Sequence, residues 1–475
     1  MNKKLIRPRL AAACLLAACA PAIAQSSDGE LKLSRRLAPS TLAKELGVKP
    51  GPALPEAAET TTPLELADAV RQAVARHPSI SDAIAVLAQQ SGGVDVARAG
   101  YYPAVRVGVG AGVNDRGSAG QGRSNGGLAT ASVSQMLYDF GKVSGAVGQS
   151  EAQVQRQQAT ILKQIDAVAQ QAAEAVVMTH RYQSLVAIAQ EQVQAVEKVL
   201  QTAQLRATAG LSTKADPIQA ESRVDSARAN LLQVKSQLAQ WRERLGTLLG
   251  RSVPPRMAPL PEHLASELRV DMQPDTSLMP EVLAAEAERR VATAQLEVAR
   301  AQRYPTLSLD ASVNRPMGGM NSGVPERSGG SHSVMLNLSS VLYQGGALEA
   351  QVNAAVAAEQ AARMRIETAR LNAGDQVRNF REQVIGAQAR LGVLADRRRS
   401  IAEARDLYRE QYTLGTRSIL DLLNAEQEIH QAAADEEAVL HELWTSRVGY
   451  IGATGQSRAY YGLNNTTVQG IEVLP

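Results

Sequence analysis

The sequence predicts an internally duplicated, mainly α-helical protein with a small set of membrane-crossing β-strands. Three observations lead to this fold class. First, only 3% of the 475 residues are aromatic, and Ala, Gln, Glu and Arg dominate long stretches, as in Ala-packed helices. Second, the order of motifs in the first half of the chain recurs in the second half. Third, four segments alternate apolar with small or polar residues over about ten positions, as tilted membrane strands do.

The first segment, residues 1–24, is predicted to be an export signal. Basic residues precede an apolar run at 10–20 that is too short to cross a bilayer as a helix. The Ala-Ile-Ala sequence at 22–24 fits cleavage by a signal peptidase. The Leu-Ala-Ala-Cys sequence at 16–19 resembles a lipobox, in which Cys19 would carry a lipid. Both kinds of processing remain open, and both export the mature chain.

A tandem duplication organises the remainder of the chain. The dipeptides at 77–78 (His-Pro) and 102–103 (Tyr-Pro) recur 202 positions later as Met-Pro and Tyr-Pro, and the loop 210–221 recurs 205 positions later. The motifs divide the chain into an extended segment (25–62), a first repeat (63–250), a Pro-rich linker (251–278), a second repeat (279–455) and a C-terminal tail (456–475).

Each repeat is expected to contain the same elements. A helix (79–101 and 280–303) precedes two strands (about 102–114 and 128–138, then about 304–314 and 333–343). A very long helix (145–208 and 347–412) follows, then a Gly-containing turn and a final helix (213–249 and 418–454). Apolar residues of the long helices step by three and four positions along two adjacent seams, which predicts helix contacts on both sides. At 1.5 Å per residue, the longest helices would reach about 100 Å.

The strand segments distinguish this chain from a pure coiled coil. Val105, Val107 and Val109 alternate with Arg106 and Gly108, so that one face suits lipid and the other suits a polar lumen. Four strands cannot close a barrel, and open strand edges are not tolerated in lipid. Several copies of the chain must therefore share one barrel, and physics alone allows two, three or more copies.

Composition and motifs exclude several functions. The formal net charge is +3 and no patch combines basic with aromatic residues, so we expect no nucleic-acid partner. Two cysteines cannot form a disulfide scaffold or a multi-cysteine metal site. Because no Walker loop, Gly-x-Ser-x-Gly elbow or Cys/His nucleophile pair occurs, we expect no enzymatic activity and no cofactor. The six histidines lack metal-ligand spacing, and no adjacent carboxylate–histidine pattern supports zinc even at His430 and His441, so we expect no metal site.

Three motifs give the chain its resemblance to a known family. They lie at 137–142 (Leu-Tyr-Asp-Phe-Gly-Lys), at 342–346 (Leu-Tyr-Gln-Gly-Gly) and at 414–425 (Leu-Gly-Thr-Arg-Ser-Ile-Leu-Asp-Leu-Leu-Asn-Ala). With them the chain resembles TolC-family outer-membrane channels over almost all of residues 63–455. The resemblance implies a homotrimer, in which twelve strands form one barrel in outer-membrane lipid and twelve helices form a periplasmic tunnel.

The resemblance also implies a function and a set of partners. Such channels are passive exit ducts of Gram-negative bacteria, used in multidrug efflux and in type I protein secretion, and the two strand-end motifs look more like the secretion-type branch. Each duct docks on a periplasmic adaptor that connects it to an inner-membrane transporter. The competing hypothesis is a periplasmic coiled-coil adaptor or scaffold of an export system. The four alternating strands weigh against it, because an adaptor needs no lipid-facing strands.

In the family, the periplasmic tip closes like an iris through polar links between neighbouring helices. Carried over by motif, Asp216 and Tyr412 are expected to form one link and Arg417 another. Asp421 matches the acidic residue that rings the constriction. Asn424 falls where some members have a second acidic residue, which leaves one acidic ring and weakens the expectation of strong cation selectivity.

A plainer interpretation of the acidic residues stands beside the gating one. Asp216 and Asp421 follow the turn glycines Gly210 and Gly415, where an acid serves as a helix N-cap or as a first-turn residue that favours the helix dipole. Three copies of Asp421 close to one axis would repel one another, favour cations and raise one another's pKa. Both roles can hold at once.

Overall fold

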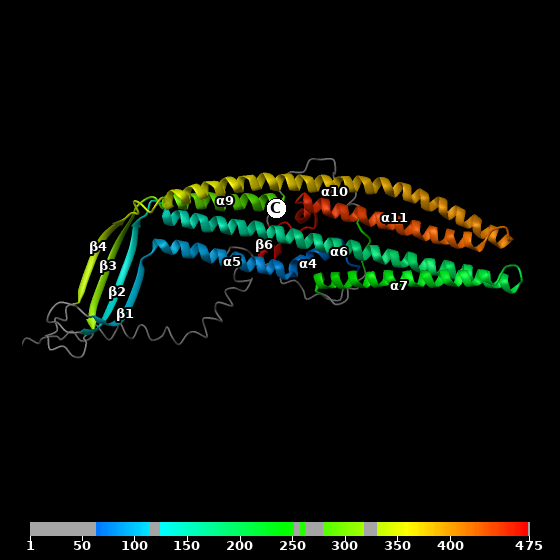
Figure 1. Ribbon diagram of the computed structural model, residues 1–475, viewed down its shortest axis with the longest axis horizontal. Coiled ribbons are helices and arrows are strands. Elements are labelled where there is room, and N and C mark those ends of the chain that lie inside the picture. Colours follow the sequence, from blue (N-terminus) through cyan, green and yellow to red (C-terminus); the bar gives the residue numbers. More distant parts are fainter. Residues whose placement is uncertain (1–62, 115–123, 251–256, 262–278, 318–329, 474–475) are drawn as a thin grey trace, which may run out of the picture.

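The computed structural model describes residues 63–114, 124–250, 257–261, 279–317 and 330–473. The predicted export signal with Cys19, the extended segment 25–62 and most of the linker 251–278 lie outside the described residues. The molecule is long and narrow, with a small sheet at one end and helices that run away from it to the other end (Figure 1).

The helices confirm the mainly α-helical, internally duplicated fold. The first repeat contains α4 (Leu66–Arg76), α5 (Pro78–Arg98, continued by the 3-10 turn Ala99–Tyr101), α6 (Lys142–Thr208) and α7 (Ala215–Leu249). The second repeat contains α9 (Pro280–Ala301), α10 (Ala347–Leu414) and α11 (Ile419–Ala453). At 1.5 Å per residue, α6 and α10 each extend about 100 Å. Among the described residues, no helix is both long and apolar enough to cross a bilayer.

Local chemistry sets where these helices begin and end. Pro78 and Pro280 occupy the first turn of α5 and α9, where the missing N–H costs no hydrogen bond. Gly250 and Gly415 cap α7 and α10 in the left-handed region, at φ 65° and 81°, which glycine adopts without strain.

The Leu-Tyr-Asp-Phe-Gly-Lys motif is the junction between sheet and helix. The Asp139 carboxylate accepts hydrogen bonds from the backbone N–H groups of Gly141 (3.0 Å) and Val143 (2.6 Å), which caps the first turn of α6. Phe140 has a positive φ of 56°, and its ring stacks on Tyr304 at a centroid distance of 5.6 Å. The motif therefore holds the start of α6 against the end of α9.

Four antiparallel strands form the sheet in the order β1-β2-β3-β4. They are β1 (Ala104–Asn114), β2 (Ser124–Tyr138), β3 (Thr306–Met317) and β4 (Ser331–Ser339). The β4 strand ends at Ser339, before the expected end near residue 343, and Tyr343 is 86% exposed. In the first repeat, by contrast, Tyr138 pairs with Leu307 because β2 is an inner strand with neighbours on both sides.

The two faces of the sheet differ in polarity. Val107 of β1 (77% exposed) and Leu336 of β4 (65% exposed) belong to an apolar face that the register continues across all four strands. On the opposite face, the Asp310 carboxylate accepts hydrogen bonds from the hydroxyls of Ser134 (2.5 Å) and Ser308 (3.0 Å). A sheet of this kind separates an apolar medium from a polar one.

The largest core lies midway along the helices and joins both ends of the described chain. It packs α4, α5 and α7 around the Ala-rich middle of α6, where small side chains allow the helices to approach closely. The tail beyond residue 455 is not a plain extension: it folds into α12 (Ser457–Tyr460) and a hairpin of β5 (Thr467–Val468) and β6 (Ile471–Glu472). The Gln469 amide donates hydrogen bonds to the carbonyls of Val74 and His77, both at 3.1 Å.

Candidate functional site

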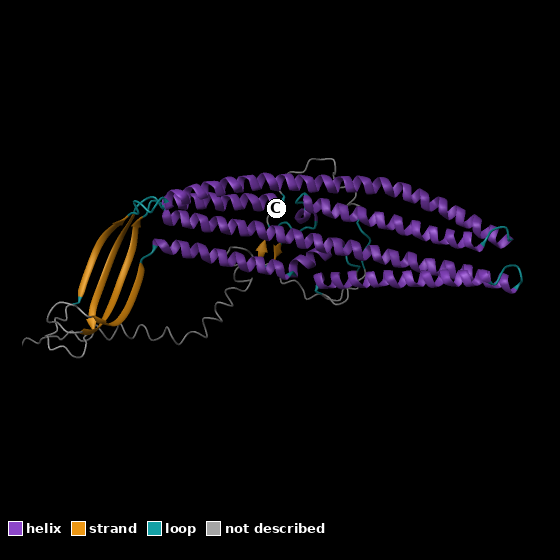
Figure 2. Cartoon of the chain, in the orientation of Figure 1, coloured by secondary structure: helices purple, strands orange, loops and turns teal. Residues whose placement is uncertain are grey.

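The residues expected to form a gate lie at the end of the molecule farthest from the sheet. There the turn between α6 and α7 lies close to the turn between α10 and α11, and Figure 2 shows both loops beyond the last helical turns. An apolar cluster joins the two hairpins. Its buried members are Val196, Val199 and Ala203 of α6, Ala220 and Val224 of α7, Tyr412 of α10, and Ile419, Leu422 and Leu423 of α11.

Tyr412 lies inside this cluster, with only 3% of its surface exposed. Its hydroxyl is buried and has no hydrogen-bond partner among the described residues. The Arg206 guanidinium lies 5.0 Å from the ring centre, and its Nη1 donates to the Thr413 carbonyl at 2.8 Å. Burial, and then the negative charge of Asp216, raise the pKa of Tyr412, while Arg206 lowers it.

Asp216 is thus close to Tyr412 but does not bond to it within this chain. Its carboxylate instead accepts a hydrogen bond from the Thr213 hydroxyl at 2.9 Å, in the first turn of α7. This contact fits the interpretation of Asp216 as a first-turn acid of α7. The negative charge of the carboxylate still raises the pKa of the Tyr412 hydroxyl.

Arg417 and Asp421, to which the sequence assigns separate roles, are paired with each other. Arg417 Nε lies 3.1 Å from Asp421 Oδ2, and the guanidinium stacks over the Tyr408 ring at 3.9 Å from its centre. Ser418 is the N-cap of α11, and its hydroxyl accepts a hydrogen bond from the Asp421 backbone N–H at 3.3 Å. The Asp421 side chain remains 44% exposed, so its carboxylate is both a first-turn acid and accessible to ions.

Asn424 connects the two hairpins. Its side-chain oxygen accepts a hydrogen bond from Arg223 Nη2 at 3.2 Å, and Arg223 Nη1 donates to Gln427 Oε1 at 2.8 Å. An arginine of α7 thereby bridges two amides of α11. Nothing in the linear sequence singled out Arg223, because an isolated arginine on a helix carries no local signature.

A buried charge cluster close to the tip was also missed. The Glu426 carboxylate is 0% exposed, and it pairs with Arg409 Nη2 at 2.5 Å and with Arg405 Nη1 at 3.6 Å, both on α10. His430 Nε2 lies 4.0 Å from the same carboxylate. The equivalent residue of the first repeat, Glu221, is exposed. The two glutamates occupy equivalent positions in the two repeats. Their packing differs because Arg405 and Arg409 correspond to uncharged residues in α6.

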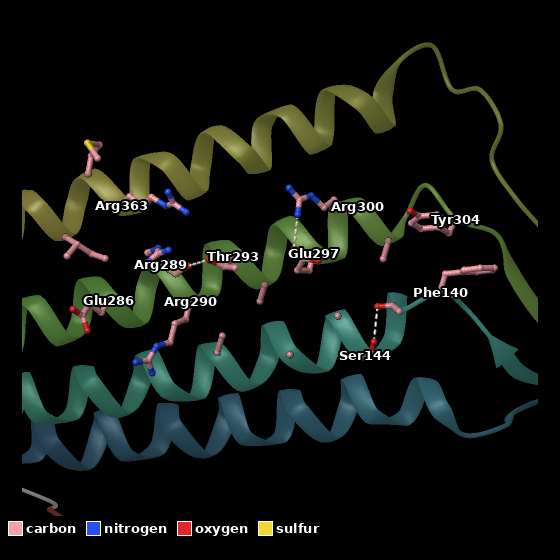
Figure 3. Close-up of a pocket in the computed structure, with 18 of the residues that line it drawn as sticks. Phe140, Ser144, Glu286, Arg289, Arg290, Thr293, Glu297, Arg300, Tyr304 and Arg363 are labelled. Atoms are coloured by element: carbon pink, nitrogen blue, oxygen red, sulfur yellow. Dashed lines mark hydrogen bonds and ion pairs between the residues drawn. The ribbon is translucent and has the colours of Figure 1, made fainter.

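A cavity of about 1310 Å³ lies at the opposite end of the helices, close to the sheet. Figure 3 shows its lining from α6, α9 and α10. Arginines and glutamates alternate along its wall, and Arg300 pairs with Glu297 at 3.0 Å. Arg289 and Arg363 both contact Glu359, at 3.3 Å and 2.7 Å, which balances much of the local charge.

Two histidines and a carboxylate come together at one place, although the sequence predicted no metal site. His180 of α6 and His441 of α11 are 261 residues apart, yet His180 Nδ1 lies 3.0 Å from His441 Nε2. Glu437 precedes His441 by one helical turn and completes a group able to hold a metal ion. The sequence does contain this carboxylate–histidine spacing, but only the packing of α6 on α11 adds the second imidazole. Burial lowers the pKa of both histidines, and the charge of Glu437 partly opposes that effect.

An amphipathic four-stranded sheet that leads directly into two helical hairpins of about 100 Å is the subunit architecture of an outer-membrane channel. The profile of the family described as "Outer membrane efflux protein" matches residues 69–251 and 277–456, one match for each repeat. The chain belongs to this family, and its resemblance to TolC-family channels is confirmed. The family consists of passive channels, so the chain is not an enzyme.

Individual relatives and structures agree with the family. Protein CyaE of Bordetella pertussis is 26% identical over 433 residues, which cover 88% of each chain. The outer membrane efflux protein BepC of Brucella suis is 22% identical and covers 69% of this chain and 72% of its own. The outer membrane protein VceC of Vibrio cholerae has a similar fold, with a TM-score of 0.71 at 19% identity over 82% of this chain and 96% of VceC.

Proposed function

We propose that this protein is the outer-membrane exit duct of a tripartite export system, with its helices in the periplasm. The observation that carries the proposal is the sheet, which has an apolar face and a polar face and leaves the outer edges of β1 and β4 without a partner strand among the described residues. Unpaired edges are costly in lipid, so each edge requires another copy of the chain. Three copies, as in the family, would close a barrel of twelve strands.

The proposed duct opens by a movement of the helix tips. Opening requires the α6–α7 and α10–α11 hairpins to separate or tilt, which strains the apolar cluster around Tyr412 and the bridge from Arg223 to Asn424. Contacts with a periplasmic adaptor and an inner-membrane transporter supply the free energy for this movement. The ion pair with Arg417 offsets part of the charge of Asp421, so three copies of Asp421 at one axis would give weak cation selectivity.

The first experiment measures the native mass of the protein extracted from outer membranes in a mild detergent. A mass three times that of one chain, lost only on harsh heating, is the expected result. A soluble monomer, or recovery in the inner-membrane fraction, would support the scaffold hypothesis and overturn the duct.

A second experiment tests the gate in planar lipid bilayers. The double variant Tyr412→Phe, Arg417→Ser should conduct more than the parent, because both side chains are proposed to link neighbouring helices of the closed tip and Arg417 is also the partner of Asp421. Arg399→Ser is a matched control, since Arg399 lies on α10, as Tyr412 does, and forms an exposed ion pair with Asp396 at 3.2 Å. Equal conductance of the double variant and the parent would refute the gate assignment.

The exported substrate is the finer part of the proposal. Multidrug efflux and type I secretion use the same kind of duct, and the motifs at 137–142 and 342–346 favour secretion. Deletion of the gene should therefore remove a protein from the culture medium while drug susceptibility stays unchanged. Increased drug susceptibility with an unchanged medium would favour efflux instead.

A further inference from the structure

We propose that His180, Glu437 and His441 form a binding site for a divalent transition-metal ion of the Zn²⁺ type, between α6 and α11. The site lies in the helical part of the molecule, away from both the sheet and the tip turns. It does not depend on the proposed export function. Three features support the site: the separation of the two ring nitrogens, the bond that orients one ring, and the position of the carboxylate.

The two imidazoles are already spaced almost as metal ligands. Two nitrogens bound to one tetrahedral Zn²⁺ at about 2.0–2.1 Å are about 3.3 Å apart. His180 Nδ1 and His441 Nε2 are 3.0 Å apart. A separation larger by a few tenths of an ångström, which rotation of the rings can supply, would admit the ion.

A backbone bond fixes the ring nitrogen that His441 presents. His441 Nδ1 donates to the Glu437 carbonyl at 2.9 Å, so its Nε2 carries a lone pair directed at His180. Metal-bound histidines are commonly oriented in this way, by a bond from the other ring nitrogen to a carbonyl. In the absence of metal, His180 donates its Nδ1–H to that lone pair. When the proton of His180 moves to its Nε2, the lone pairs of His180 Nδ1 and His441 Nε2 face the same point, where the ion would bind.

Glu437 supplies the third donor. Its carboxylate is largely buried (21% exposed), with Oε1 3.5 Å from His441 Nδ1 and one oxygen within 4.8 Å of a ring nitrogen of each histidine, so a rotation of the side chain would bring an oxygen to the ion. Two imidazoles, one carboxylate and one water make up a donor set that suits Zn²⁺. Arg181 is near enough to lower the pKa of His441, and the charge of Glu437 offsets its repulsion of a cation.

The test uses the full chain without an affinity tag, in detergent, after removal of metal by a chelator. Titration with Zn²⁺ alone, followed by calorimetry and by metal counting after dialysis, should give one ion per chain. Co²⁺ in place of Zn²⁺ should give the visible absorption bands of a tetrahedral site. His430→Gln is the matched control, because His430 also lies on α11 four residues after a glutamate, Glu426.

The variants decide the outcome. His180→Gln and Glu437→Gln should each weaken Zn²⁺ binding at least tenfold, while His430→Gln leaves it unchanged. Because His441 is only 1% exposed and its replacement endangers folding, the two less buried ligands carry the test, with native mass as the check on folding. If the parent binds no Zn²⁺ saturably, or if His180→Gln binds as tightly as His430→Gln, the site does not exist.

Discussion

Glu426 allows the sharpest test of how the tip is held together. Replacement by Gln keeps the shape of the side chain but removes the charge that faces Arg409 and Arg405. Loss of one partner of a fully buried ion pair costs about 3–5 kcal/mol. Because Arg409 is 49% exposed and regains water when the pair is lost, we expect a smaller cost, of about 2 kcal/mol. That cost corresponds to about a 30-fold larger equilibrium constant for local opening of the α10–α11 hairpin.

Hydrogen exchange followed by mass spectrometry, on the assembled protein in detergent, measures this opening directly. Amides near the end of α10 and the start of α11 should exchange about 30-fold faster in Glu426→Gln than in the parent, in the regime where exchange reports the opening equilibrium. Glu221→Gln is the matched control, because Glu221 is the equivalent residue of the first repeat and is exposed on α7. Exchange that is equally fast in both variants would show that the buried pair does not clamp the hairpin.

Three further predictions concern the sheet, a close helix contact and pH. Leu336→Arg, on the apolar face of β4, should destabilise the barrel by about 2–4 kcal/mol and so reduce the yield of heat-resistant oligomer. Asn337→Arg, on the polar face, should be tolerated, and equal yields of the two variants would contradict the assignment of the faces. Gly449→Ala would place a methyl group against the Phe380 ring, which should destabilise the fold by about 1–3 kcal/mol and lower the melting temperature. An unchanged melting temperature would mean that α10 and α11 separate freely there. Burial raises the pKa of Asp166 from 3.8 to about 7, so the stability that its protonation contributes is complete below pH 3.8 and is lost as the pH rises through about 7. The thermal stability of Asp166→Asn should therefore fall less than that of the parent as the pH is raised from about 4 to about 8, and parallel curves would refute this.

Much of the fold could be predicted because its determinants are local. The alternation at Val105, Val107 and Val109 follows the two-residue period of a strand, and the seams of α6 and α10 follow the spacing of packed helices. Glycine at 415 marks the turn between α10 and α11, where its positive φ is required. The Asp-Phe-Gly sequence at 139–141 is recognisable as a motif in the sequence, and the structure adds that Asp139 caps α6.

The candidate site was less predictable because its contacts link residues far apart in the chain. Arg206 of the first repeat stacks on Tyr412 of the second, and His180 meets His441, 261 residues further along the chain. No periodicity relates such pairs, so only the packed helices bring them together. The duplication itself can mislead, since it equates Glu221 with Glu426 although one is exposed and the other is buried.

The core that joins α4 to the segment after α11 has a consequence for the order of folding. Leu66 and Val473 belong to the same buried cluster, although almost the whole described chain separates them. Contacts of such long range form late, because the intervening chain must first be ordered. The hairpins α6–α7 and α10–α11 depend on nearer contacts and can form before the rest of the chain is ordered. The central core is therefore completed only after the segment with α12, β5 and β6 arrives, so a chain truncated before Gln469 would keep its hairpins but lack the bonds that join its two ends.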